Sequence, residues 1–206
     1  MRANKSRWLI LPAIIACTSC FNTRMVSTWS DPANRGVALK KIAVVGFRRS
    51  DLNRRLFEDE MCALLTQHGA QAEQSYNLMA EPPDTNADAL LDQFKGKGFD
   101  GVLVSHVIGL KSDVQTTPAT RQYVPERRYD RFGNFYRIVM TEETTPGTET
   151  VSEYIQIQTH LYRASDGGLI WAAQSETERT GSAQTRMEDY SKAVVSDLAG
   201  NKLLPK

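Results

Sequence analysis

The sequence feature that most constrains the fold is a regular alternation of strand and helix patterns between residues 40 and 110. The run IAVVGF at 42–47 is continuously apolar and follows two lysines, which is typical of a strand covered on both faces. In chain order the predicted elements are a strand at 42–47, a helix at 51–68, a strand at 69–76, a helix at 86–95 and a strand at 99–110. This order favours right-handed βαβ crossovers and a partly parallel sheet.

The helix predicted at 51–68 is amphipathic. Ser50 or Asp51 can cap its first turn, and Gly69 follows its end as a residue suited to a left-handed conformation. Apolar residues at helical spacing predict the side that lies on the sheet: Phe57, Met61, Leu64 and Leu65. The charged residues on the other side are predicted to face solvent: Arg54, Arg55, Glu58, Asp59 and Glu60.

The chain after residue 150 predicts an antiparallel hairpin and a closing helix. Residues 151–162 alternate between apolar and polar side chains, and a second β-rich run at 169–177 follows a turn at Asp166-Gly167-Gly168. The last helix, near 185–199, carries one apolar stripe: Met187, Tyr190, Val194 and Leu198. The predicted fold class is α/β (α+β), a mixed β-sheet with a βαβαβ start, a long insertion, a closing β-hairpin and a C-terminal helix packed on the sheet.

The insertion at 111–150 breaks this rhythm with prolines, many threonines and no helical pattern. Its segment 121–137 (RQYVPERRYDRFGNFYR) holds five arginines against two acidic residues, a local charge of +3, with aromatic residues between them. Arginine and tyrosine are over-represented at binding hot spots because they bury large areas and still form hydrogen bonds. The candidate contact residues are Arg121, Tyr123, Arg127, Arg128, Tyr129, Arg131, Phe132, Phe135 and Tyr136.

Two interpretations of this segment stay open. Gly133-Asn134 can turn the tip of a hairpin, which predicts an arm that reaches beyond the domain. The alternative is a mobile loop whose aromatic residues fold back onto the sheet. Long insertions of this kind are usually either functional or disordered.

The amino-terminal residues indicate export. Residues 1–7 carry three basic residues and no acid, and the apolar run WLILPAIIA follows at 8–16. This is the pattern of a secretory signal, and the run is too short for a spanning helix, which needs about 20 apolar residues. The four residues Ile14-Ile15-Ala16-Cys17 resemble the lipobox of bacterial lipoproteins, in which a peptidase cuts before a lipid-modified cysteine. The alternative is an ordinary signal peptide cut near Ala16.

The lipobox resemblance implies a chain anchored by lipid on Cys17. Thr18, where an Asp would favour the inner membrane, implies the outer membrane and a periplasm-facing protein. The predicted domain plan is a signal peptide at 1–16, a lipidated cysteine and tether at 17–39 with a short edge strand near 25–29 that tucks Trp29 onto the domain, one domain at 40–200 and a tail at 201–206. Cys62 is predicted to be buried as a small hydrophobe, and a Cys20–Cys62 disulfide is the alternative.

The charge balance bears on the partners. Cleavage leaves 190 residues with 22 basic and 24 acidic side chains, a formal charge of −2. This length is enough for one domain with a proper core. A chain with this near-neutral charge has no overall positive potential that would attract polyanions, and an exported protein is not expected to bind nucleic acid.

The strand KKIAVVGF, the helix segments RRLFEDE and LLTQHGA, and the strand GFDGVLVSHVIG resemble a large group of Gram-negative lipoproteins of uncharacterised role. Their domain is similar to the TolB amino-terminal and CsgG/LpoB-like α/β fold, and the likeness covers most of residues 25–200. Related lipoproteins are secretion channel subunits, activators of wall synthases and transport auxiliaries. The resemblance therefore implies a fold and an envelope setting, and it transfers no functional residue.

The sequence carries no catalytic pattern. The histidines, His68, His106 and His160, have neither metal-ligand spacing nor a triad arrangement, so structural roles are predicted for them. Ser105 and His106 are neighbours on a strand and point to opposite faces. G-x-S-x-G, a phosphate-binding glycine loop and H-E-x-x-H do not occur. We expect no enzyme, no cofactor and no bound metal.

These patterns favour an outer-membrane-anchored periplasmic lipoprotein that acts as an adaptor or assembly component of the cell envelope. Its arginine- and aromatic-rich insertion would contact a protein partner, with anionic lipid headgroups or the wall as alternatives. A second hypothesis is an oligomeric CsgG-like pore in which the insertion supplies a membrane hairpin, although the alternation this needs occurs only around 135–140. A third is a periplasmic small-ligand sensor or enzyme with a pocket at His106 or His160. The oligomeric state stays open.

Overall fold

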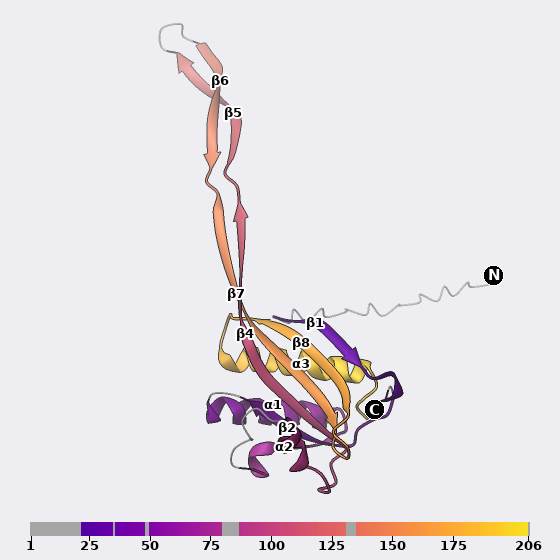
Figure 1. Cartoon of the computed structure of the whole chain (residues 1–206). Helices are drawn as coiled ribbons and strands as arrows, with labels where there is room; N and C mark the ends of the chain where they lie inside the picture. The colour runs from indigo at the N-terminus through magenta and orange to yellow at the C-terminus, as the bar shows by residue number, and fades with distance from the viewer. Residues whose placement is uncertain (1–21, 35, 48–49, 80–86, 131–134, 206) are drawn as a thin grey trace, which may run out of the picture.

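The structure is a computed structural model that describes residues 22–34, 36–47, 50–79, 87–130 and 135–205 (Figure 1). Its elements are, in chain order, β1 (Thr23–Ser30), the 3-10 helix η1 (Pro32–Asn34), β2 (Lys41–Phe47), α1 (Asp51–Gln67), β3 (Gln71–Gln74), the 3-10 helix η2 (Ser75–Asn77), α2 (Ala87–Asp92), β4 (Gly101–Thr117), β5 (Thr120–Asp130), β6 (Phe135–Thr145), β7 (Thr148–Arg163), β8 (Leu169–Glu178) and α3 (Ala183–Gly200).

Six of the strands form one mixed sheet in the order β1-β8-β7-β4-β2-β3. The strands β3, β2 and β4 run parallel, and α1 and α2 connect them. The strands β7, β8 and β1 add antiparallel neighbours to β4. The predicted fold class is confirmed, because the sheet is mixed, begins with βαβαβ and closes with a hairpin and a C-terminal helix.

Helices cover both faces of the sheet near its parallel strands. One core packs α1 and α3 on the sheet and includes Ile42, Val44 and Trp171. A second, smaller core lies on the other face under α2 and includes Ala43 and Val45. All four of these β2 residues are fully buried, which is what the continuous apolar run predicts for a strand covered on both faces.

The prediction that all charged residues of α1 face solvent is wrong for Arg54 and Glu58. These two side chains are 4% and 0% exposed. The Nε of Arg54 donates to a Glu58 carboxylate oxygen at 3.0 Å, and the Gly46 backbone N–H and the Ser75 hydroxyl donate to the same oxygen at 3.0 and 2.7 Å. Because each charge is neutralised and the carboxylate accepts several hydrogen bonds, the pair is tolerated in the core. Arg55 is exposed, as predicted.

The segments predicted as a tether and a tail both pack on the domain. The predicted edge strand is present as β1 and pairs with β8, but Trp29 is 49% exposed rather than tucked against the domain. Within the predicted tail, Leu203 and Leu204 are buried, and the Leu203 carbonyl accepts the Leu39 backbone N–H at 2.9 Å. Both terminal segments therefore contribute to the core or to the sheet.

The insertion at 111–150 is β-structure through most of its length. The outer parts of β4 and β7 pair with each other, and beyond them β5 pairs with β6 as a second, two-stranded sheet. Together they form a long ribbon that projects from one end of the sheet (Figure 1). We call residues 111–117, 120–130, 135–145 and 148–153 the arm, and the rest of the described chain the body. The interpretation of an arm beyond the domain is correct for the described residues, and the predicted turn at Gly133-Asn134 lies outside them.

Candidate functional site: the arm

The arm is a ribbon without lateral support. The β7–β8 pairing ends with Tyr154 opposite Glu178, the Arg179 backbone N–H still donates to the Glu153 carbonyl at 2.7 Å, and beyond Glu153 β7 has only β4 beside it. From Asp113 to Asp130 the ascending strands span roughly 60 Å at about 3.3 Å per residue. Both edges of such a ribbon present unpaired backbone N–H and C=O groups, and two strands alone are marginally stable in water. The arm therefore leaves both backbone edges and much of its side-chain surface exposed.

One face of the outer arm carries exposed apolar side chains around Arg127, with the ion-paired Arg121 and Glu142 at its inner end. Directly paired residues share a face, and the register pairs Pro125 with Met140 and Arg127 with Ile138, with Tyr123 two residues before Pro125. We call these residues the Tyr123 face: Tyr123, Pro125, Arg127, Ile138 and Met140. Tyr123, Ile138 and Met140 are 65%, 68% and 58% exposed. Arg127 is exposed and forms no ion pair with any residue that the structure describes.

The opposite face of the outer arm holds the half-buried Val124 and Val139 together with polar side chains that pair with one another. Arg128 donates to Glu126 at 3.3 Å, and the Thr141 hydroxyl donates to the same carboxylate oxygen at 2.9 Å. The Thr141 hydrogen bond and the Arg128 charge hold the pKa of Glu126 below its usual value. The Arg128 charge is therefore neutralised within the arm, whereas Arg127 on the Tyr123 face has no ion-pair partner among the described residues.

The predicted contact residues are separated by this geometry. Tyr123 and Arg127 share a face, and Arg121 lies on the same side with an ion pair to Glu142 at 3.4 Å. Arg128 lies on the other side. The backbone register sets Tyr129 opposite Tyr136 and Asp130 opposite Phe135, while Arg131 and Phe132 lie outside the described residues. Their role in binding stays a prediction.

Sequence reasoning missed an apolar stripe on the inner arm. Leu110 pairs with Ile155, and Val114 pairs with Val151, all on the face that continues the α3-covered core past Ile157. Leu110, Val114 and Val151 are 63%, 52% and 58% exposed. We call Leu110, Val114, Val151 and the half-buried Ile155 the shaft stripe. Val151 lies on the same face of β7 as the core residues Ile157 and Leu161, and its exposure shows that this face extends beyond the helices that cover it.

A polar cluster fixes the base of the arm to the body. Glu176 on β8 is 3% exposed and accepts hydrogen bonds from Arg24 Nε at 3.0 Å, Gln156 Nε2 at 3.1 Å and Lys111 Nζ at 3.2 Å. These donors come from β1, β7 and β4. The Arg24 hydrogen bond, with help from Gln156 and Lys111, lowers the pKa of Glu176 to about 2 against the opposing effect of burial. Glu176 thus joins four strands at the point where the arm leaves.

The histidines give no catalytic arrangement. His106 and His160 stack with ring centroids 5.9 Å apart, and burial lowers the pKa of each, with the neighbouring His106 adding to the shift of His160. Ser105 lies on the other face, where its hydroxyl accepts from the Tyr190 hydroxyl at 2.7 Å, so the expected separation of Ser105 from His106 is confirmed. His68 caps the end of α1. Within the described ranges, no cluster of three or more His, Cys, Asp or Glu side chains is placed to hold a metal ion.

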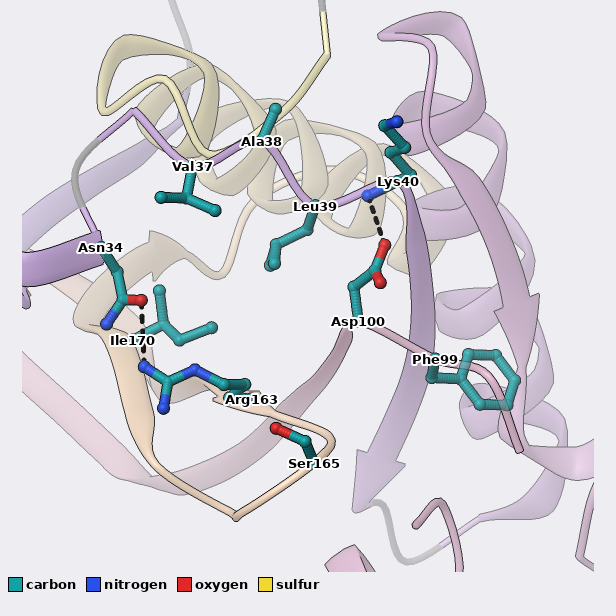
Figure 2. A pocket seen from close by; sticks show the side chains of 10 residues that line it. All are labelled: Asn34, Val37, Ala38, Leu39, Lys40, Phe99, Asp100, Arg163, Ser165 and Ile170. Carbon is teal, nitrogen blue, oxygen red and sulfur yellow. Dashed lines mark hydrogen bonds between the residues drawn. The ribbon is translucent and has the colours of Figure 1, made fainter. Parts of the chain in front are cut away.

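The cavity drawn in Figure 2 lies away from both the arm and the histidines. Its volume is about 410 Å³, and it opens between the segment around Leu39 and the turn after β7. Two of its charged side chains are already engaged: an Asp100 carboxylate oxygen accepts the backbone N–H groups of Lys40 and Lys41 at 2.8 and 2.9 Å, and Arg163 donates to Asn34 at 2.9 Å. The hypothesis of a ligand pocket lined by His106 or His160 gains no support from it.

Two further sequence predictions concern cysteine and the membrane. Cys62 is buried as predicted and has no cysteine partner among the described residues, and burial raises the pKa of its thiol. Cys17 and Cys20 lie outside the described residues, so lipidation and a Cys20–Cys62 disulfide stay predictions. In the part of the chain that the structure describes, no helix has the length and apolar character needed to cross a membrane.

Comparison with known proteins gives a fold-level likeness. No protein-family model matches the chain, and no curated protein matches it. Similar solved structures include a PelC dodecamer from Paraburkholderia phytofirmans, at 12% identity over 89% of this chain and 99% of that chain with a TM-score of 0.45. Lipoprotein GNA1162 from Neisseria meningitidis is similar at 15% identity over 78% of this chain and 99% of that chain, with a TM-score of 0.38. At these values neither protein carries a function over to this chain.

Proposed function

We propose that this protein is a non-enzymatic adaptor or assembly component of the bacterial cell envelope, anchored by lipid on Cys17 to the outer membrane and facing the periplasm. Its arm makes the contact with a protein partner. The observation that carries the proposal is the arm itself, a ribbon roughly 60 Å long that leaves apolar side chains and both backbone edges exposed. The amino-terminal signal pattern and Cys17 support the anchor and the compartment.

The shaft stripe is the part of the arm best suited to a protein partner. Its inner end joins the core, since Ile155 packs on the core opposite the exposed Leu110. Val114 and Val151 stand more than half exposed beyond the intervening Ser112–Glu153 pair. A small cavity of about 140 Å³ lies where the stripe meets α3 and is lined by Ile155, Met187 and Tyr190. Fully burying an exposed Val or Leu side chain contributes about 1.5–3 kcal/mol, and Leu110, Val114 and Val151 are 63%, 52% and 58% exposed, so a partner that covered the stripe would gain roughly half of that amount from each.

Site-specific photo-crosslinking in cells tests this contact. A crosslinking amino acid at Val114 or Val151 should give a discrete adduct with one protein. The next cross-strand pair, Gln115 and Thr150, lies on the opposite face and serves as the control. Val114→Ser should reduce the adduct formed from position 151. Equal labelling from both faces, or no protein adduct from any position, would contradict an adaptor role for the shaft stripe.

The anchor is tested separately. Mass spectrometry of the protein from its native membrane should find a chain that begins at Cys17 and carries lipid. Cys17→Ser should leave unprocessed or soluble protein. Normal membrane fractionation of that variant would contradict lipid anchoring and would leave the arm contact to be judged by the crosslinks.

An oligomeric pore or secretion subunit is the second candidate, and one observation favours it. The strands β5 and β6 are each 11 residues long, and a membrane-crossing strand needs about 9–11. Arg127 stands in the middle of the apolar face, where a lipid-facing cation is costly. Detergent-extracted protein that migrates as a large ring would support this candidate over the adaptor.

A further inference from the structure

The chain enters the sheet at the end from which the arm leaves. Thr23, at the start of β1, pairs with Thr177, which pairs with Ile155, which pairs with Leu110. These four residues form one row across the sheet, directly below the arm. Figure 1 shows the start of β1 beside the base of the arm. The proposed anchor, Cys17, precedes Thr23 by only six residues.

This short connection limits how the body can stand on a membrane. Six residues span about 20 Å when fully extended, at roughly 3.3–3.6 Å each. The body extends from the Thr177 row to Leu169 at the other end of β8, about 27 Å at 3.3 Å per residue. If the arm pointed straight away from the bilayer, the body would have to fit between the bilayer and Thr23, and the tether is shorter than the body. The arm must therefore lie along the membrane or dip toward it.

A single arm is unsuited to the hydrocarbon interior. Its two open edges would leave backbone N–H and C=O groups without partners, which the interior of a bilayer does not tolerate. Charged side chains also occur along its length, with Asp113, Glu143 and Glu149 on the parts nearer the body. The interfacial region offers water and headgroups to both the edges and the charges. The arm is therefore expected to rest on the surface.

The Tyr123 face has the composition of an interfacial element. Tyr123, Ile138 and Met140 present exposed apolar surface, and Arg127 stands among them with its charge unpaired among the described residues. Arginine can extend its stem along apolar groups while its guanidinium reaches a phosphate, and tyrosine suits the boundary between headgroups and acyl chains. The segment 121–137 carries a net +3, and the whole of 120–145 a net +1 because Glu142 and Glu143 lie nearer the body, so the positive charge that an anionic surface attracts is concentrated in the outer half of the arm.

We infer that the Tyr123 face docks on anionic phospholipid headgroups of the same leaflet that holds the lipid anchor. This inference rests on the proposed anchoring at Cys17. It names the partner of the outer arm and leaves the shaft stripe to the protein partner. Anchor and arm then act as two separate membrane attachments, which would fix the orientation of the body and hold the shaft stripe close to the bilayer.

The test uses the lipidated full chain reconstituted into vesicles. A polarity-sensitive dye is attached at Ile138→Cys, on the Tyr123 face, or at Gln122→Cys, on the opposite face, each in a Cys20→Ser background. On vesicles of phosphatidylethanolamine and phosphatidylglycerol, the dye at 138 should shift to the blue and be quenched by nitroxides near the headgroups. The dye at 122 should keep its aqueous spectrum. Phosphatidylcholine vesicles or high salt should weaken the shift at 138.

Arg127 and Arg128 provide a matched pair of variants. They are adjacent, exposed and of equal charge, but they lie on opposite faces and Arg128 is paired with Glu126. Arg127→Ser should lower the equilibrium constant for docking about fivefold, the factor that one cation near an anionic surface typically contributes. Arg128→Ser should lower it much less.

Each contrary result would overturn a different part of this inference. A dye at 138 that stays aqueous on anionic vesicles, with the protein still vesicle-bound, overturns the docking and leaves the anchor intact. Quenching at 138 only by nitroxides deep in the bilayer overturns surface placement in favour of insertion. A blue shift at 138 that needs an added protein shows that this face binds protein instead. A preparation in which mass spectrometry finds no lipid removes the anchor and this inference with it.

Discussion

The strands β4 and β7 run through both the body and the arm, but their side chains are buried in the body and exposed in the arm. At Leu103 and Leu161 these strands are fully buried and covered by helices. At Val114 and Val151, further along the same strands and on the same face, the side chains are more than half exposed. An alternating strand pattern therefore predicts which side chains share a face, but it does not predict what covers that face. In the body the helices of the same chain cover it, and in the arm it is exposed.

The largest expected effect is in the body. Glu58→Gln would leave the Arg54 guanidinium in the core without its carboxylate, and breaking a buried ion pair in this way typically costs about 3–5 kcal/mol. Urea unfolding should show this loss, and the exposed Asp51→Asn should change stability by less than about 0.5 kcal/mol. Equal stability of the Glu58→Gln variant and the native protein would show that the pair is not what holds α1 against β2 and η2.

A smaller effect is expected at the junction between the two regions. Glu176→Gln should destabilise the protein by about 2 kcal/mol, less than a fully enclosed pair would, because the Arg24 and Lys111 side chains are 60% and 42% exposed. The pKa of Glu176 is lowered to about 2 from 4.5, so its contribution is complete above pH 4.5 and is lost as the pH falls toward 2.

Acid unfolding followed by circular dichroism measures this contribution. The native protein should lose stability between pH 4.5 and 2, and the Glu176→Gln variant should lose less over that interval. Parallel curves for the two proteins would mean that Glu176 is not charged and paired in the folded state.

The next effect concerns the pH dependence of stability that His106 and His160 contribute. Because the folded protein holds the pKa values of His106 and His160 below the ordinary 6.5, the unfolded chain binds more protons as the pH falls through 6.5. Stability should therefore decline on acidification from pH 7.5 to below 6.5. His106→Gln together with His160→Gln should flatten this dependence in thermal melts at the two pH values. If stability depended on pH equally in the double variant, other titratable groups would be responsible for that dependence.

The smallest effect on stability is expected in the arm. Val114→Ser removes apolar surface that is already 52% exposed, so the thermal midpoint should stay within about 2 °C of the native value. Its effect should appear in partner crosslinking instead. A large fall in the midpoint would show that the arm stabilises the body and would erase the contrast between the two regions.

Much of the body was predictable because its signals are local. The run at 42–47, the turn at Asp166-Gly167-Gly168 and the apolar stripe of α3 each lie within one stretch of chain. Gly69, predicted to follow α1, has a φ of 80°, the left-handed conformation that glycine adopts readily. The arm was predictable only as an unusual composition, because threonine, proline and arginine across 111–150 signal neither a buried strand nor a helix.

The candidate site shows the limit more clearly. Neighbouring positions Arg127 and Arg128 look equivalent in sequence, and only the β5–β6 register puts one on an apolar face and the other beside Glu126. Arg54 and Glu58 likewise follow the spacing of a solvated helix face. Their burial depends on Ser75 and Gly46, which arrive from η2 and β2.

The sequence by itself determined the order of the elements, the strands and helices of the body, and the segment from which the arm is built. Local backbone preferences and the spacing of apolar residues carry that information along the chain. Only the tertiary structure decided that the first and last thirds of the chain meet, with Thr23 paired to Thr177, and that the entry of the chain and the base of the arm share one end of the sheet. Such pairings join residues far apart in sequence, and no local pattern specifies which distant strand will supply the partner.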